Sequence, residues 1–243
     1  MLQVIQHQKT GKITVEELPA PQLKPGGVVV RNLCSLISAG TERNSVETAQ
    51  ASLLGKARSR PDLVRQVLDN VKREGLVATY HKVQNRLENY KELGYSSAGI
   101  VVESSCDEFK VEDRVACAGV GYASHASLIF VPRNLVVRIP DNVTFEQAAF
   151  TTVGAIAMQG VRQADVSVGE CVVVIGLGLV GLLTAQILKA SGCMVFGLDI
   201  LPHHLDLARA SGCEACAQSG WDALPLLEGW LGGADLHAAI DGD

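Results

Sequence analysis

Features that mark nucleic-acid-binding, membrane or secreted proteins are missing from this sequence. Aromatic residues make up 5% of the 243 residues, and no block of Lys and Arg interrupts a net charge of −5. Nucleic-acid surfaces need stacking platforms or basic patches, so we expect neither a nucleic acid nor an anionic membrane as a partner. The N-terminus also lacks the apolar core of a signal peptide.

Long hydrophobic runs and a cysteine framework are lacking as well. The most apolar stretch, residues 171–188, contains three glycines and two polar residues, which is typical of a buried core rather than of a membrane span. The seven cysteines have no framework spacing. We therefore expect a cytoplasmic protein in a reducing compartment.

The composition is that of a globular protein, and the chain contains two kinds of sequence pattern. Hydrophobic residues reach 47% and charged residues 19%, which favours a packed core over disorder. Short β-prone runs with turns occupy residues 4–37 and 98–139, and helix formers dominate between them. From Pro140 onward, strands and helices alternate. We predict a two-domain α/β protein with domains at 1–150, carrying a helical insert at about 44–92, and at 151–243.

Local signals predict individual helices. Thr144 and Gln147 fit a capping box, so a helix should follow, and then another through about Ala164. Pro61 suits a first helical position, with apolar residues at helical spacing over 63–71. A further helix is expected at 224–231.

A glycine-rich turn stands in the second domain. An apolar run at 171–175, typical of a strand buried on both faces, leads into Gly-Leu-Gly-Leu-Val-Gly at 176–181. Gly176 permits a tight turn, Gly178 lets the backbone approach a pyrophosphate, and Gly181 allows the next helix to pack closely. The N-terminus of that helix would face the phosphates with free N–H groups.

Asp199 ends the next apolar strand, 18 residues after Gly181. A carboxylate there can accept hydrogen bonds from both ribose hydroxyls and would repel a 2′-phosphate. The pattern therefore predicts NAD(H) rather than NADP(H). The expected cofactor-binding residues are Gly176, Gly178, Leu179, Val180, Gly181 and Asp199.

The second domain is expected to contain four strands in the order 3-2-1-4, the last at 236–240. Doubly wound domains normally have six, so we expect the chain to be truncated at its C-terminus.

The order of these parts resembles the medium-chain dehydrogenases/reductases, the zinc alcohol dehydrogenase superfamily. Residues 109–115 (FKVEDRV) and 139–149 (IPDNVTFEQAA) are similar to two characteristic segments of that family. The resemblance implies a GroES-like β-barrel followed by a partial Rossmann domain, a doubly wound parallel sheet. It also implies a cleft for a small-molecule substrate.

A narrower group is more similar still. Residues 35–43 (SLISAGTER), the helical insert and residues 93–99 (LGYSSAG) resemble the bi-domain oxidoreductases of bacterial polysaccharide clusters. In that group a medium-chain module is fused to a Gfo/Idh/MocA-type dehydrogenase module. The resemblance thus implies a fused or associated domain of that type as partner, and it leaves a homo-oligomer open.

The zinc ligands of the family are not matched. Its Cys-Gly-Thr-Asp segment reads Ala39-Gly40-Thr41-Glu42 here, Tyr95 replaces the ligand histidine, and the third ligand position falls at about Val153. We therefore expect no zinc and no other metal site.

Other potential metal ligands have plainer interpretations. The lone CxxC at 213–216 falls on the expected third strand, where core cysteines are the simpler interpretation. His203 and His204 are expected in a solvated loop, and His125 in a strand with a structural role.

Without zinc, hydrogen-bond donors would have to polarise the hydride acceptor. The resemblance implies Thr41 as the proton-relay hydroxyl, while Tyr95 can place a phenol in the same cleft and Glu42 can act as orienter or base.

The leading hypothesis is a zinc-independent, NAD(H)-dependent oxidoreductase for a carbonyl, alcohol or activated double bond. A sugar-like substrate is suggested only by association with the resembling group. The alternative is a non-catalytic NAD-binding module that supports a second dehydrogenase domain. A true zinc alcohol dehydrogenase is hard to sustain with Ala39 and Tyr95.

Overall fold

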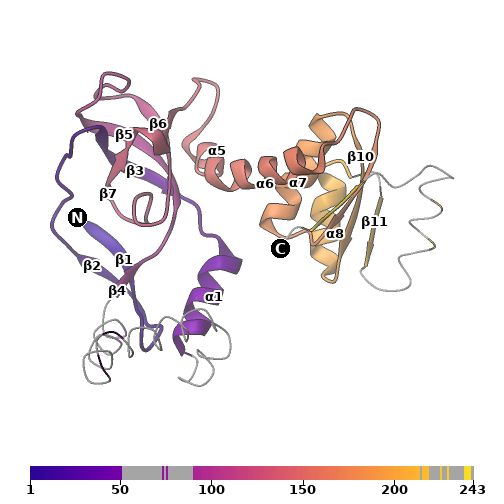
Figure 1. Cartoon of the computed structure of the whole chain (residues 1–243), viewed down its shortest axis with the longest axis horizontal. Helices are drawn as coiled ribbons and strands as arrows, with labels where there is room; N and C mark the ends of the chain where they lie inside the picture. The colour runs from indigo at the N-terminus through magenta and orange to yellow at the C-terminus, as the bar shows by residue number, and fades with distance from the viewer. Residues whose placement is uncertain are drawn as a thin grey trace. The chain divides into compact units, whose positions relative to one another are not determined.

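Two units of different construction make up the chain, Met1–Thr151 and Thr152–Asp243 (Figure 1). The computed structural model describes residues 1–50, 73, 75, 90–213, 215–218, 225, 229 and 238–241. The helix predicted from Pro61 lies outside the described residues, and so does the helix predicted at 224–231 apart from residues 225 and 229.

Antiparallel strands form two sheets in the first unit. The three-stranded sheet has the order β2-β1-β4, from β1 (Leu2–His7), β2 (Ile13–Glu17) and β4 (Tyr90–Glu92). The five-stranded sheet has the order β7-β3-β5-β6-β8. Its strands are β3 (Gly27–Ser35), β5 (Ser96–Ser104), β6 (Arg114–Ala118), β7 (Leu128–Pro132) and β8 (Val136–Arg138). An isolated bridge pairs Gln3 of β1 with Ala126, which precedes β7.

Alternating apolar residues place the core of this unit on one face of the larger sheet. Five valines there are fully buried, namely Val28, Val30, Val101, Val115 and Val131. Each such side chain contributes about 1.5–3 kcal/mol by leaving water. The core therefore fixes β3, whose exposed end carries the residues discussed below.

Helix α1 (Ala39–Gln50) follows β3 closely and begins before the predicted start of the insert at 44. At the other end of the insert, residues 90–92 form β4 rather than helix. The capping box is confirmed at α5 (Phe145–Ala148), because Thr144 Oγ1 accepts from Gln147 N and Gln147 Oε1 accepts from Thr144 N. Helix α6 (Thr151–Ala164) ends where the sequence predicts.

The second unit holds a parallel sheet with the order β11-β10-β9-β12. Its strands are β9 (Cys171–Ile175), β10 (Met194–Asp199), β11 (Ala215–Gln218) and β12 (Ala238–Asp241), packed with helices α7 (Leu179–Ala190) and α8 (Pro202–Ala210). This is the predicted 3-2-1-4 order, and the α/β fold class is confirmed. Among the described residues, no helix is long and apolar enough to cross a membrane.

The strand order reverses at β9, which lies between β10 and β12. In open parallel sheets, ligands bind beyond the carboxyl ends of the strands at such a reversal. Ile175 and Leu198 are paired at that edge, so Gly176 and Asp199 follow on neighbouring strands.

Candidate functional site

The glycine-rich turn joins β9 to α7. Gly176 has φ +84°, a left-handed conformation that side chains with a Cβ rarely adopt, and its N–H donates to Leu198 O at 2.8 Å. Leu177 is fully buried beneath the turn. Gly178 is the N-cap of α7, and Gly181 is buried in the first turn of that helix. The predicted residues thus build one continuous strand–turn–helix.

Asp199 ties this turn to β10. Its Oδ2 accepts from Leu177 N at 2.6 Å and lies 3.0 Å from His204 Nδ1, and its Oδ1 accepts from Leu201 N at 2.7 Å. Burial disfavours the charged carboxylate, but the hydrogen bonds from Leu201, Leu177 and His204 outweigh it, so the pKa of Asp199 lies below its ordinary value. Asp199 is therefore an anion held at the edge of the turn.

The residues of this turn fit a dinucleotide. A Cβ built on Gly178 would meet nothing within 4 Å, and no side chain caps the N-terminus of α7. The open space and the amides of the first helical turn, with their partial positive charge, suit a pyrophosphate. Asp199 Oδ1 accepts the Leu201 hydrogen bond and can accept another from a ribose hydroxyl.

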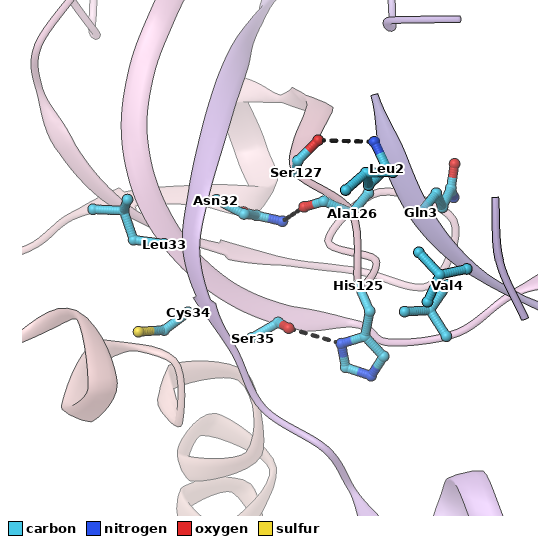
Figure 2. Close-up of a pocket in the computed structure, with 11 residues that line it drawn as sticks. Leu2, Gln3, Val4, Asn32, Leu33, Cys34, Ser35, His125, Ala126 and Ser127 are labelled. Atoms are coloured by element: carbon cyan, nitrogen blue, oxygen red, sulfur yellow. Dashed lines mark hydrogen bonds between the residues drawn. The ribbon is translucent and has the colours of Figure 1, made fainter. Parts of the chain in front are cut away.

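A second polar cluster lies in the first unit, at the start of α1. Glu42 Oε1 accepts from Ser38 N at 3.2 Å and lies 3.0 Å from His125 Nε2. The other ring nitrogen, Nδ1, lies 2.9 Å from Ser35 Oγ (Figure 2). Thr41 Oγ1 accepts from Ser38 Oγ at 3.2 Å. The structure therefore joins the predicted Thr41 and Glu42 in one network with Ser35, Ser38 and His125.

Sequence reasoning missed the part played by Ser35 and His125. The expected strand around His125 is wrong, because the residue precedes β7 in a bend. Contacts spanning 83 and 90 residues bring it to Glu42 and Ser35, and no local pattern encodes them.

Tyr95 is not joined to Thr41 or Glu42 by any hydrogen bond among the described residues. Its phenol is half-buried, and its backbone carbonyl accepts from Gly119 N at 2.9 Å. The preceding Gly94 lies against His125, since a Cβ on it would come within 2.8 Å of His125 Nδ1. Tyr95 is thus next in the chain to the cluster, without being part of its hydrogen bonding.

The positions of the family's zinc ligands do not suit a zinc ion. Ala39 and the fully buried Val153 carry no donor atom, and Tyr95 offers only a phenol. Within the described part of the chain, no group of three or more His, Cys, Asp or Glu is arranged to hold a metal. Three protein ligands are the usual requirement of a catalytic zinc, and these three positions do not supply them.

The loop expected at His203 and His204 is wrong, because both residues lie in the first turn of α8. His203 is exposed, whereas His204 contacts Asp199. Of the CxxC pair, Cys213 is buried and Cys216 lies in β11, paired with Gly197 of β10.

Sequence comparisons find named dehydrogenases. A D-guloside 3-dehydrogenase of Escherichia coli (strain K12) is 34% identical over 129 residues, covering 51% of this chain and 36% of the relative. An uncharacterized zinc-type alcohol dehydrogenase-like protein of the same organism is 30% identical over 142 residues, covering 53% and 40%. An L-threonine 3-dehydrogenase of Rhizobium etli (strain CIAT 652) is 28% identical over 243 residues, covering 93% and 66%.

The sequence relatives of this chain are medium-chain dehydrogenases. The predicted resemblance to that superfamily is confirmed. The chain spans between about a third and two thirds of the length of the relatives just described. No family model matches the chain. A fused Gfo/Idh/MocA-type module stays a prediction.

Solved structures support the fold of this chain. Galactitol-1-phosphate dehydrogenase from Escherichia coli has a TM-score of 0.72 at 18% identity, covering 98% of this chain and 67% of that one. The quinone oxidoreductase of Thermus thermophilus, determined also as its complex with NADPH, has a TM-score of 0.67 at 20% identity, covering 96% and 64%. At these identities the likeness establishes architecture alone.

Proposed function

We propose that the protein is a zinc-independent, NAD(H)-dependent oxidoreductase that transfers a hydride to or from the carbonyl or alcohol carbon of a sugar-like substrate. When bound, the nicotinamide would supply or accept the hydride. The chain's own residues bind the dinucleotide in the second unit and provide hydrogen-bonding groups for the substrate oxygen in the first.

Gly178 is the observation that carries cofactor binding. Its φ is −69°, a value that any residue adopts, and its missing Cβ would face open space. Neither backbone strain nor internal packing therefore requires glycine there. A ligand that approaches the backbone does require it, and the uncapped N-terminus of α7 makes that ligand an anion such as a pyrophosphate.

Asp199 supports NAD(H) over NADP(H). Its pKa is lowered, so the carboxylate is charged near neutral pH and would repel a 2′-phosphate. The adenosine ribose, by contrast, offers two hydroxyl donors to that carboxylate.

The relatives' names support an alcohol or sugar substrate. They include dehydrogenases of D-guloside and L-threonine, which each carry a secondary alcohol. In the first unit, Thr41 and Tyr95 remain the proposed hydrogen-bond donors for polarising the substrate oxygen without a metal, and Glu42 remains the proposed orienter or base. A cytoplasmic location belongs to the same proposal, because the cysteines lack framework spacing.

A non-catalytic role is the second candidate, favoured by Ala39 and Tyr95 at positions where the family keeps zinc ligands. The module would then bind NAD(H) and support a fused or associated Gfo/Idh/MocA-type domain.

Turnover in the presence of a chelator separates the two candidates. The full chain, treated with EDTA and dialysed, is incubated with NAD+ and a panel of alkyl hexosides and secondary alcohols while NADH absorbance is followed. We expect turnover with at least one substrate, and we expect EDTA to leave that turnover unchanged. Elemental analysis by mass spectrometry should find less than about one zinc ion per ten chains, whereas a zinc-dependent member holds about one catalytic zinc per chain. NADH binding without turnover would favour the non-catalytic candidate. Activity that vanishes with EDTA and returns with zinc would refute the metal-free assignment.

A further inference from the structure

Three side chains from distant parts of the first unit lie in a line. Ser35 ends β3, His125 precedes β7, and Glu42 lies in the first turn of α1. Ser35 Oγ is 2.9 Å from His125 Nδ1, and His125 Nε2 is 3.0 Å from Glu42 Oε1 (Figure 2 shows the Ser35–His125 contact). Both distances are those of good hydrogen bonds.

The surroundings fix this line. Glu42 also accepts from the backbone N–H of Ser38, at the N-terminus of α1, where the helix dipole favours a negative charge. Gly94, with φ +91°, lets its backbone approach the imidazole, because any Cβ there would come within 2.8 Å of Nδ1. The side chains of His125 and Glu42 are only 9% and 15% exposed. The pair is therefore well shielded from water.

The hydrogen-bond roles follow from the chemistry of the groups. An ionised Glu42 can only accept, so Nε2 of His125 must carry a hydrogen. In the neutral ring Nδ1 is then an acceptor, and the only hydrogen available for that contact is the hydroxyl hydrogen of Ser35. The arrangement thus aims the Ser35 proton at Nδ1 of an imidazole whose Nε2 faces the Glu42 carboxylate.

Ser35 is the exposed end of the line. It lines a surface pocket of about 280 Å³, together with His125, Asn32 and Cys34. The pocket is also lined by the apolar residues Leu2, Val4 and Leu33 (Figure 2), and by Val15. A small molecule in this pocket can reach the serine hydroxyl, whereas the carboxylate stays behind the imidazole.

We propose that Ser35, His125 and Glu42 are a proton relay for the substrate oxygen, with Ser35 as the catalytic residue and the other two acting through it. This relay rests on the proposed oxidoreductase function, and it would move the proton of the substrate oxygen without a metal. In alcohol oxidation a bound nicotinamide would accept the C–H hydrogen with its electron pair as a hydride. The alcohol O–H proton passes to Ser35 Oγ, and the proton of Ser35 passes to His125 Nδ1. The imidazolium, paired with Glu42, then returns that proton through Ser35 Oγ to water in the pocket, and carbonyl reduction follows the reverse path.

Conservative variants of the full chain test the relay by kinetics. Ser35→Ala removes the hydroxyl, and His125→Gln keeps a donor near the position of Nε2 without a base. We expect each to lower kcat about 100-fold while KM changes less than about threefold, which is the size of a general acid–base effect. The solvent deuterium isotope effect on kcat should rise as proton transfer becomes limiting.

Controls are Ser105→Ala and His7→Gln, which alter hydrogen-bonded side chains in the same unit away from the relay. Unchanged kcat in both relay variants of an active enzyme would overturn the relay and leave the oxidoreductase assignment standing.

The tautomer of His125 provides a readout that needs no turnover. Long-range ¹H–¹⁵N spectra of the protein without cofactor should show Nε2 protonated and Nδ1 unprotonated, and Glu42→Gln should shift that signal toward the other tautomer. A wild-type Nδ1–H tautomer would refute the relay, whether or not the protein turns over. Absence of turnover with the expected tautomer would instead refute the proposed function.

Discussion

Asp199 acts within the protein as well as toward a proposed ligand. Its carboxylate receives the Leu177 amide from the turn and the Leu201 amide from the segment after β10. Hydrogen bonds to a buried charge are stronger than those between neutral groups, so this residue fixes the shape of the site before any cofactor arrives. The sequence predicted its position from spacing but not this internal role.

Replacing Asp199 should destabilise the fold in a pH-dependent way. Because its folded pKa is lowered, the stabilisation is present above the ordinary carboxyl value of about 3.9 and is lost as pH falls through the lowered value. We expect Asp199→Asn to reduce the free energy of unfolding by about 1–3 kcal/mol at pH 7 and by less near pH 3, measured by urea denaturation. The exposed Asp206→Asn is the control, and should cost less than about 0.5 kcal/mol. Equal losses for Asp199→Asn at both pH values would show that charge is irrelevant there.

The residues of the two polar sites differed in how far they could be predicted. Gly176, Gly178 and Asp199 belong to a local pattern in which one strand, one turn and one helix set every spacing. His125 reaches Glu42 only because the folded sheet brings distant segments together, which no periodicity records.

Among the elements, strands were predicted more closely than helix starts. Strand β9 has the predicted bounds, since a continuous apolar run marks a buried strand. Helix α1 begins before the predicted start of the insert at 44, because its first residues carry no apolar spacing of the kind that marks a helix in a sequence.

Two glycines of the turn between β9 and α7 should respond differently to alanine. Gly176→Ala places a Cβ at φ +84° and should cost about 1–2 kcal/mol of stability. Gly178→Ala meets no protein atom and should change stability by less than about 0.5 kcal/mol. It should weaken NADH binding by about tenfold or more, because the methyl group intrudes on the phosphate.

Urea denaturation and NADH fluorescence titration of both variants measure these effects. Retained NADH affinity in Gly178→Ala would mean that the cofactor phosphates lie elsewhere.

At the scale of the whole molecule, the fold class and strand order of the second unit followed from the alternation of strands and helices. The family resemblance followed from two segments of the first unit and from the order of the parts along the chain. The substrate did not follow, because the first unit combines distant side chains whose proximity only the fold creates. The chain also covers only part of the length of its relatives, so the activity of the whole is carried by the proposals above.

Cofactor preference tests the central claim most directly. The full chain is titrated with NADH and with NADPH, and binding is followed by nucleotide fluorescence, alongside Asp199→Ala. We predict NADH binding at least about tenfold tighter than NADPH, the effect of some 1.4 kcal/mol of repulsion, and a smaller ratio in the variant. Equal binding of both nucleotides, or a ratio that Asp199→Ala leaves unchanged, would contradict the assignment of this site to NAD(H).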